Sequence, residues 1–198
     1  HAHPQNIAKV LRAHFAPSAP DRVFVDADLA NCHVYFAATR TKDGALLSAL
    51  EAGDIYGAVA AALPDVPGAR AAAKVAVASQ LNGGGVPAIS KALKALGVDA
   101  PTTRAKAILA AWKKAYPACA LGVRSILDDV ERKEQDGAAT YTLFTLGGRE
   151  IEIPIGNGRA LAALSAHWSS CEADVLDYVL ANFESRIAVL GGRLVLPM

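Results

Sequence analysis

Arg70 and Lys74 stand four residues apart at the start of an alanine-rich helical segment that ends at the glycine cluster 83–85. Residues four apart on a helix point the same way, so both cations can contact one ligand, and Ala78 and Asn82 continue the same stripe. Arginine binds phosphate oxygens through a planar fork, and lysine supplies a compact charge and a mobile proton. The pair predicts a polyphosphate-binding face. The alternative is a solvated helix with two ordinary surface charges.

The charge is unevenly distributed along the chain. The formal net charge is only +1, yet the segment from Arg70 to Arg124 contains nine lysines or arginines and one acid, Asp99. The acids gather in 128–131 and towards the termini. The middle of the chain can therefore offer a positive surface to an anionic partner although the whole chain is nearly neutral.

Composition limits the classes of protein that the chain can be. With 198 residues, 53% of them hydrophobic, it can form a packed core, which excludes intrinsic disorder as the main state. The three cysteines, Cys32, Cys119 and Cys171, lack a C-x-x-C spacing, which predicts neither a zinc site nor a disulfide framework and favours a reduced, intracellular setting. No apolar stretch has the length and character of a membrane span, so we expect a soluble protein without a membrane partner.

The order of predicted elements indicates the α+β class. A short strand over 22–28 would present the carboxylate of Asp28 at its end, because most of its residues are apolar or β-branched. Helices are then expected over 45–50, 55–63, 70–82 and 86–96, from 101 towards 116, and from there to about 137. An alternating hairpin over 140–154, a helix over 159–189 and a strand from Gly192 complete the order. Both ends are abrupt, which predicts a chain excised from something larger.

Several short motifs in this order resemble the palm and fingers of family A DNA polymerases, over almost the whole chain. The matching segments are Gln5-Asn6-Ile7, Leu11-Arg12 with Phe15, Val25 to Asp28, Asp43 to Leu50, Gly53 to Tyr56, Arg70 with Lys74, Tyr116-Pro117, Thr145 to Arg149 with Pro154, and Ala173 to Val175. The resemblance implies mostly helical fingers inserted into a partial antiparallel palm sheet of a right-hand polymerase. Palm parts would be 1–40 and 156–198, and fingers 41–155, with the chain ending before the second catalytic motif.

The resemblance also implies a two-metal mechanism of nucleotidyl transfer. Asp28 would be a catalytic ligand of Mg²⁺, and the carbonyl of Leu29 would add a second oxygen, because Mg²⁺ prefers hard donors. Two ions are expected, and the second aspartate ligand would follow Met198. Arg70 and Lys74 would bind the triphosphate, and Lys74 would protonate the leaving pyrophosphate. The alternative for Asp28 is a capping aspartate at a strand end.

The chain departs from the family at nucleotide-binding positions. Ala78 replaces an aromatic residue and Asn82 a tyrosine, so base stacking is lost there. His33 replaces the glutamate that acts as a steric gate, Asn31 replaces a glutamine, and Tyr35 an arginine. His33 either lines the nucleotide site or is an internal histidine satisfied by a backbone carbonyl.

The resemblance also concerns the DNA contacts. It assigns Arg12, Ser165 and Ser169 to DNA binding, and the two serines replace an asparagine and a glutamine, which weakens the expected duplex contacts. Asp174 and Asp177 are expected on a solvated or capped helix face and do not replace the second aspartate. Four further residues are expected to be structural: Trp112, Trp168, His14 and His167.

The expected function is DNA-templated DNA synthesis by a family A enzyme in replication or repair, in the cytoplasm of a bacterial or phage-infected cell. The expected partners are primer-template DNA, deoxynucleoside triphosphates and the missing remainder of the polymerase chain, without which this fragment is expected to be inactive. One alternative is a polymerase-derived DNA- or nucleotide-binding module without efficient synthesis. Another is a phage-type single-subunit RNA polymerase, which shares the palm and an Arg/Lys fingers helix.

Overall fold

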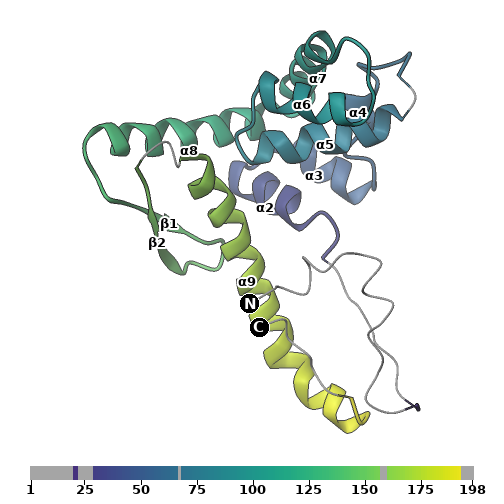
Figure 1. Ribbon diagram of the computed structural model, residues 1–198. Helices are drawn as coiled ribbons and strands as arrows, with labels where there is room; N and C mark the ends of the chain where they lie inside the picture. Colours follow the sequence, from purple (N-terminus) through teal and green to yellow (C-terminus); the bar gives the residue numbers. More distant parts are fainter. Residues whose placement is uncertain (1–19, 22–28, 67, 157–159, 193–198) are drawn as a thin grey trace. The chain divides into compact units, whose positions relative to one another are not determined.

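The computed structural model describes residues 20–21, 29–66, 68–156 and 160–192 (Figure 1). The elements are α2 (Cys32–Thr41), α3 (Gly44–Glu51), α4 (Gly57–Ala60), α5 (Ala69–Leu81), α6 (Val86–Ala95), α7 (Pro101–Ala115), α8 (Pro117–Gln135), β1 (Thr140–Phe144), β2 (Glu150–Pro154) and α9 (Ala160–Val189). This mostly helical chain with a small antiparallel sheet confirms the predicted α+β class. The strands predicted over 22–28 and after Gly192 lie outside the described residues, as do Arg12, His14 and Asp28.

The chain forms two compact units. The larger comprises residues 31–175, and the smaller comprises 1–30 together with 176–198. Helix α9 is continuous and belongs to both. In the larger unit, α9 buries Ala163, Leu164 and His167, whereas in the smaller unit Leu176, Tyr178 and Phe183 are exposed. None of the described helices is long and apolar enough to cross a membrane.

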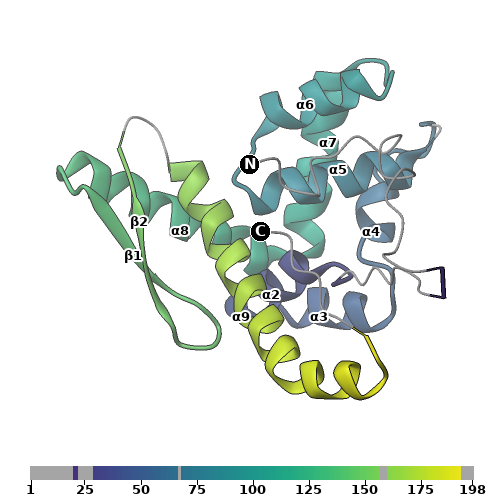
Figure 2. The same cartoon turned by 60° about the horizontal axis from the view of Figure 1, so that its bottom comes forward.

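Helix α5 is the central helix of the larger unit and contacts α2, α4, α6, α7 and α8 (Figure 2). Its alanines favour a helix and, being small, let the neighbouring helices approach closely. Its buried face consists of Ala72, Ala73, Ala76, Val77 and Leu81. The opposite face of α5 is therefore left for solvent.

A close approach at Gly83 holds the end of α5 in place. Gly83 has a φ of +74°, and a Cβ there would lie 2.7 Å from a methyl group of Leu127 and 2.6 Å from one of Leu161. Only glycine fits both the backbone conformation and the space. Next to it, the indole N–H of Trp168 donates to the carbonyl of Leu81 at 2.7 Å. Trp112 and Trp168 are both buried, as the sequence predicted.

Asp43 joins two helix starts through one buried carboxylate. Its Oδ1 accepts from the backbone N–H of Leu46 at 3.0 Å, which caps α3, and its Oδ2 accepts from the N–H of Cys119 in the first turn of α8 at 2.8 Å. These N–H groups have no partner within their own helices, and helix N-termini favour negative charge. Burial and the Asp43 charge together raise the pKa of the Cys119 thiol to about 12.

The β1–β2 hairpin follows the C-terminal end of α8, the end that lies away from α5, α6 and α7 (Figure 1). Tyr141 pairs with Ile153 and Leu143 with Ile151, so one face of the hairpin is apolar, as predicted. The turn that follows β1 carries Arg149, whose Nε donates to Asp174 of α9 at 2.7 Å. Asp174 lies on α9 and is partly exposed, as expected, but its carboxylate is also paired with Arg149, which links the hairpin to α9.

Two helices differ from the sequence expectation. Helix α2 was not predicted, since its start, Cys32-His-Val-Tyr-Phe36, consists of poor helix formers. It forms because Val34, Phe36 and Ala37 are buried in the core. Helix α4 is shorter than the predicted 55–63, because the carboxylate of Asp54 starts it at Gly57 and tighter i to i−3 hydrogen bonds end it before Pro64.

His167 is buried on α9 without a hydrogen-bond partner for either ring nitrogen among the described residues. Its ring packs 4.7 Å from the ring of Trp168, and burial, with a smaller contribution from the Arg40 charge, lowers its pKa to about 4. The expectation that His167 is structural agrees with this apolar setting.

Replacing Asp43 by alanine should lower the free energy of unfolding by about 2–4 kcal/mol, because two charge-assisted hydrogen bonds and a helix cap are lost. The measurement is a urea melt at pH 7. Asp43→Asn, which retains an acceptor oxygen, should lose less. Asp99→Ala is the matched control, since Asp99 is exposed and its side chain has no hydrogen bond to another described residue. An Asp43→Ala melt that matches the control would contradict this role.

Acid should destabilise the fold partly through His167. The unfolded histidine takes up a proton near pH 6.5, whereas the folded one resists it until about pH 4. The stability contributed by neutral His167 is therefore present above pH 6.5 and is lost as the pH falls to 4, by roughly 3 kcal/mol. Urea melts of wild type and His167→Phe at pH 7 and pH 4.5 test this. Equal acid sensitivity of the two proteins would refute the assignment.

Candidate nucleotide-binding site

The exposed face of α5 carries the predicted stripe. Arg70, Lys74 and Ala78 are all exposed, whereas the opposite face is buried. Asn82 is the C-cap residue of α5, and its side-chain amide donates to the carbonyl of Ala78 at 2.8 Å. The structure therefore places the two cations side by side on one face, and Asn82 is engaged with the backbone at the end of that face.

Arg70 is held by the segment that precedes α4. Its guanidinium forms an ion pair with Asp54, lies 5.6 Å from the ring centroid of Tyr56 and donates to the carbonyl of Gly53 at 3.5 Å. The hydrogen bond from Arg70 lowers the pKa of Asp54 below its ordinary value. Both side chains remain more than half exposed, so an anionic ligand can reach the guanidinium, but it competes with Asp54 for the fork.

Tyr56 connects this group to the start of α2. Its hydroxyl donates to the side-chain carbonyl of Asn31 at 3.0 Å. Asn31 precedes α2 with a φ of +55°, a left-handed conformation that asparagine tolerates better than most residues. The chain entering α2 and the chain entering α5 are thus linked through three side chains, Asn31, Tyr56 and Arg70.

Lys74 differs from Arg70 in having no ion pair within the described residues. The other lysines of the basic segment share this property and are exposed: Lys91, Lys94, Lys106, Lys113 and Lys114. Arg104 donates to the backbone carbonyl of Asp99, and Arg124 pairs with Asp128 and Glu131. Within the basic segment from Arg70 to Arg124, the cations without a partner in the described residues are therefore the lysines of α5, α6 and α7, which provide positive charge for an anionic partner.

His33 lies in the first turn of α2 and faces α9. Its Nε2 is 3.2 Å from a carboxylate oxygen of Glu172, and the side chains of both residues are 33% exposed. The alternative of an internal histidine bound to a backbone carbonyl is wrong, because the partner is a carboxylate. No contact of His33 with Arg70 or Lys74 is seen in the described part of the chain, so α5 and His33 are not brought together directly.

The remaining predicted site residues are dispersed. Ser165 is half-buried and Ser169 is exposed, both on α9, and Leu29 is half-buried in the segment before α2. Asp28 and Arg12 lie outside the described residues. The metal site implied by Asp28 and Leu29 and the DNA contact at Arg12 stay predictions.

Three residues beside the predicted site residues were not predicted: Asp54 and Tyr56, which contact Arg70, and Glu172, which contacts His33. Asp54 and Tyr56 belong to the segment Gly53 to Tyr56 that resembles the polymerase family. An acid and an aromatic residue two positions apart could have marked them as partners of a nearby cation. Glu172 had no local signal, because its partner His33 is 139 residues away in the sequence.

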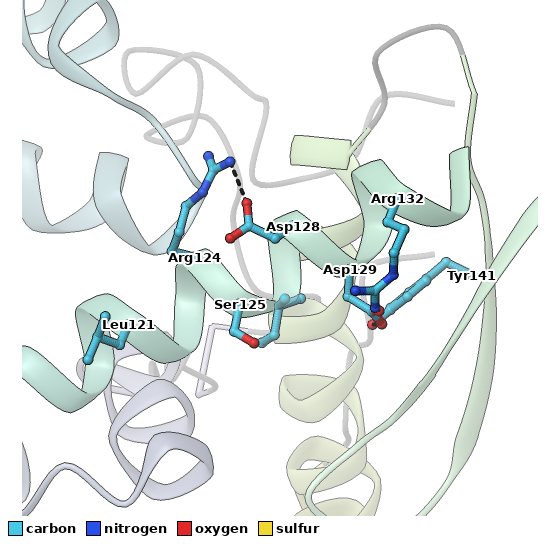
Figure 3. Close-up of a pocket in the computed structure, with 8 residues that line it drawn as sticks. Leu121, Arg124, Ser125, Asp128, Asp129, Arg132 and Tyr141 are labelled. Carbon is cyan, nitrogen blue, oxygen red and sulfur yellow. Dashed lines mark hydrogen bonds and ion pairs between the residues drawn. The ribbon is translucent and has the colours of Figure 1, made fainter. Parts of the chain in front are cut away.

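A separate pocket of about 520 Å³ lies along α8 and β1 (Figure 3). Its charged side chains are paired: Arg124 with Asp128, and Arg132 with Asp129, which also accepts from the hydroxyl of Tyr141 at 2.6 Å. Of the predicted site residues that the structure describes, none lines this pocket. With its charges neutralised in pairs, it does not extend the positive surface.

Comparison with known proteins finds a similar structure, although no similar sequence. No protein-family description matches the sequence, and no curated protein matches it. Among solved structures, the polymerase domain of Pol1 from M. smegmatis, in complex with DNA primer-template and dNTP, superposes on 83% of this chain with a TM-score of 0.59 and 21% sequence identity. The chain spans 30% of the length of that structure. At this identity the likeness concerns the fold: residues of this chain adopt the fold of part of a DNA polymerase domain.

Proposed function

We propose that this chain is the palm-and-fingers portion of a DNA-templated DNA polymerase of family A, acting in replication or repair in the cytoplasm of a bacterial or phage-infected cell. The observation that carries the proposal is the exposed α5 face with Arg70 and Lys74, in a chain whose fold is similar to a polymerase domain solved with DNA primer-template and dNTP. In this proposal residues 41–155 are the fingers, and 1–40 and 156–198 are palm.

Arg70 and Lys74 would have different roles at the triphosphate. Arg70 is oriented by Asp54 and Tyr56, so its position is set before a nucleotide arrives. Lys74 has no competing acid in the described part and can move to the phosphates. A lysine ammonium beside the leaving pyrophosphate can donate a proton to it, which stabilises the developing charge.

Asp28 and the carbonyl of Leu29 offer the hard oxygen donors that Mg²⁺ prefers. With a second aspartate from the remainder of the polymerase chain, two such ions would activate the primer hydroxyl and stabilise the leaving pyrophosphate. This assignment rests on the chemistry of the donors and on the resemblance of Val25 to Asp28 to the first catalytic motif.

The DNA partner would contact Arg12, Ser165 and Ser169. The two serines are short and neutral, so they supply hydrogen bonds without charge. The unpaired lysines of α6 and α7 supply attraction for phosphates instead, which makes the expected binding dependent on salt.

A second candidate is a polymerase-derived DNA- or nucleotide-binding module without efficient synthesis. The side chains of Ala78 and Asn82 favour it: Ala78 is too small to stack on a base, and the amide of Asn82 is bound to the backbone. A phage-type RNA polymerase is distinguished from both by its preference for ribonucleotides.

The deciding experiment is primer extension by the parent chain extended past Met198, with Mg²⁺ and either deoxynucleotides or ribonucleotides. We expect extension with deoxynucleotides and its loss in Asp28→Ala, since the first metal ligand is removed. Asp65→Ala, an exposed acid of the fingers, is the matched control and should extend normally. DNA binding without any extension would favour the binding module, and a preference for ribonucleotides would favour the RNA polymerase.

Substitutions of Lys74 in α5 and Lys113 in α7 should affect the binding of nucleotide and of DNA differently. Lys74→Ala should weaken binding of deoxynucleoside triphosphate by roughly 10- to 100-fold, the effect of one charge-assisted hydrogen bond of about 1.5–3 kcal/mol. It should weaken primer-template binding much less. Lys113→Ala, an exposed unpaired lysine of α7, should instead reduce DNA affinity and its salt dependence. Nucleotide and DNA affinities can be measured by fluorescence anisotropy, and equal loss of both in Lys74→Ala would contradict its role.

A further inference from the structure

Three side chains with metal-binding atoms meet where α2 packs beside α9. Cys32 and His33 are the first two residues of α2, and Glu172 lies on α9 within the same compact unit. The Cys32 sulfur, a His33 ring nitrogen and a Glu172 carboxylate oxygen all lie within 4.8 Å of one another, and each residue is half-buried. We call these residues the α2–α9 cluster.

We propose that the α2–α9 cluster binds Zn²⁺. Thiolate, imidazole and carboxylate are the three ligand types that zinc uses in proteins, whereas Mg²⁺ would not select a sulfur. The inference does not depend on the proposed polymerase function, and it concerns other residues than Asp28 and Leu29.

The observed distances suit a tetrahedral ion. Bonds of about 2.0–2.1 Å to nitrogen and oxygen, at a tetrahedral angle, place these two ligand atoms about 3.3 Å apart. The distance between His33 Nε2 and Glu172 Oε2 is 3.2 Å. A bond of about 2.3 Å to sulfur requires it to be about 3.6 Å from the nitrogen and the oxygen. Because the Cys32 sulfur lies within 4.8 Å of both atoms, it must come closer to each by at most about 1.2 Å.

Among the described residues the cluster has three ligands, which leaves a fourth coordination position for solvent or another ligand. The cluster supplies three protein ligands, and zinc sites with three protein ligands keep an open fourth position. The other cysteines, Cys119 and Cys171, are buried, and burial raises the pKa of both thiols. Cys32 is the more accessible sulfur, and binding of the cation would release its proton.

A zinc ion here would hold the start of α2 against α9. His33 would then be fixed as a ligand, at the position where the family resemblance places the steric gate. The sequence indicated no zinc site, because two of the ligands are adjacent and the third is more than a hundred residues away, which no spacing motif describes.

The test is a titration of the metal-free chain with Co²⁺ alone, which reports its ligands spectroscopically. We expect binding of one Co²⁺ with tetrahedral visible absorption and a thiolate-to-cobalt charge-transfer band, and displacement by Zn²⁺. Cys32→Ser should abolish the charge-transfer band, and Glu172→Gln should weaken affinity by at least about tenfold. Glu184→Gln, an exposed acid on the same helix, is the control and should bind as wild type.

A second measurement on the wild-type chain avoids the risk that a variant fails to fold. Zn²⁺ should protect Cys32 from alkylation, with the modified peptide identified by mass spectrometry, while Cys119 and Cys171 are unreactive with or without metal. A charge-transfer band that persists in Cys32→Ser, binding without such a band, or Cys32 alkylation unaffected by Zn²⁺ would each overturn the proposal. These readouts require no polymerase activity, so their failure leaves the proposed function standing, and the reverse also holds.

Discussion

The buried carboxylate of Asp43 is the interaction on which the arrangement of the larger unit depends. Its two oxygens accept one backbone N–H each from the first turns of α3 and α8, two helices that are far apart in the sequence. A buried charge is costly unless it is fully hydrogen-bonded, and helix N-termini supply both the donors and a favourable dipole. The carboxylate therefore determines where α8 begins relative to α3, and α8 in turn carries the chain to the hairpin.

The position of α5 depends on how the neighbouring helices pack against it. Its neighbours approach its buried face closely because three of the five buried residues are alanines, and contacts at Gly83 and Trp168 fix its end. Burying one face leaves the opposite face, with Arg70 and Lys74, in solvent. The candidate nucleotide site is thus a consequence of core packing: the small residues orient the helix, and the helix orients the cations.

The two cations of α5 have different environments, although the sequence presents them as a pair. Arg70 is held by a carboxylate and an aromatic ring, and its planar fork suits a fixed position. Lys74 has no such partner in the described residues, so its ammonium is free of competition from a neighbouring acid there. On the proposed function, Ala78 and Asn82 would leave this face with its charge but without a side chain for base stacking, since Ala78 is small and the amide of Asn82 is bound to the backbone.

The sequence by itself determined the elements whose signals are local. Alanine content, with Gly83, Gly97 and the prolines 101 and 117 as boundaries, predicted α5 to α8, and alternation predicted the hairpin. Only the tertiary structure decided α2, whose first five residues are poor helix formers and whose Val34 and Phe36 are stabilised by burial. It also decided the pairs Asp43–Cys119, His33–Glu172 and Arg149–Asp174, whose members are 76, 139 and 25 residues apart. Side-chain pairing at such separations depends on how helices pack, and no periodicity or spacing in the chain encodes it.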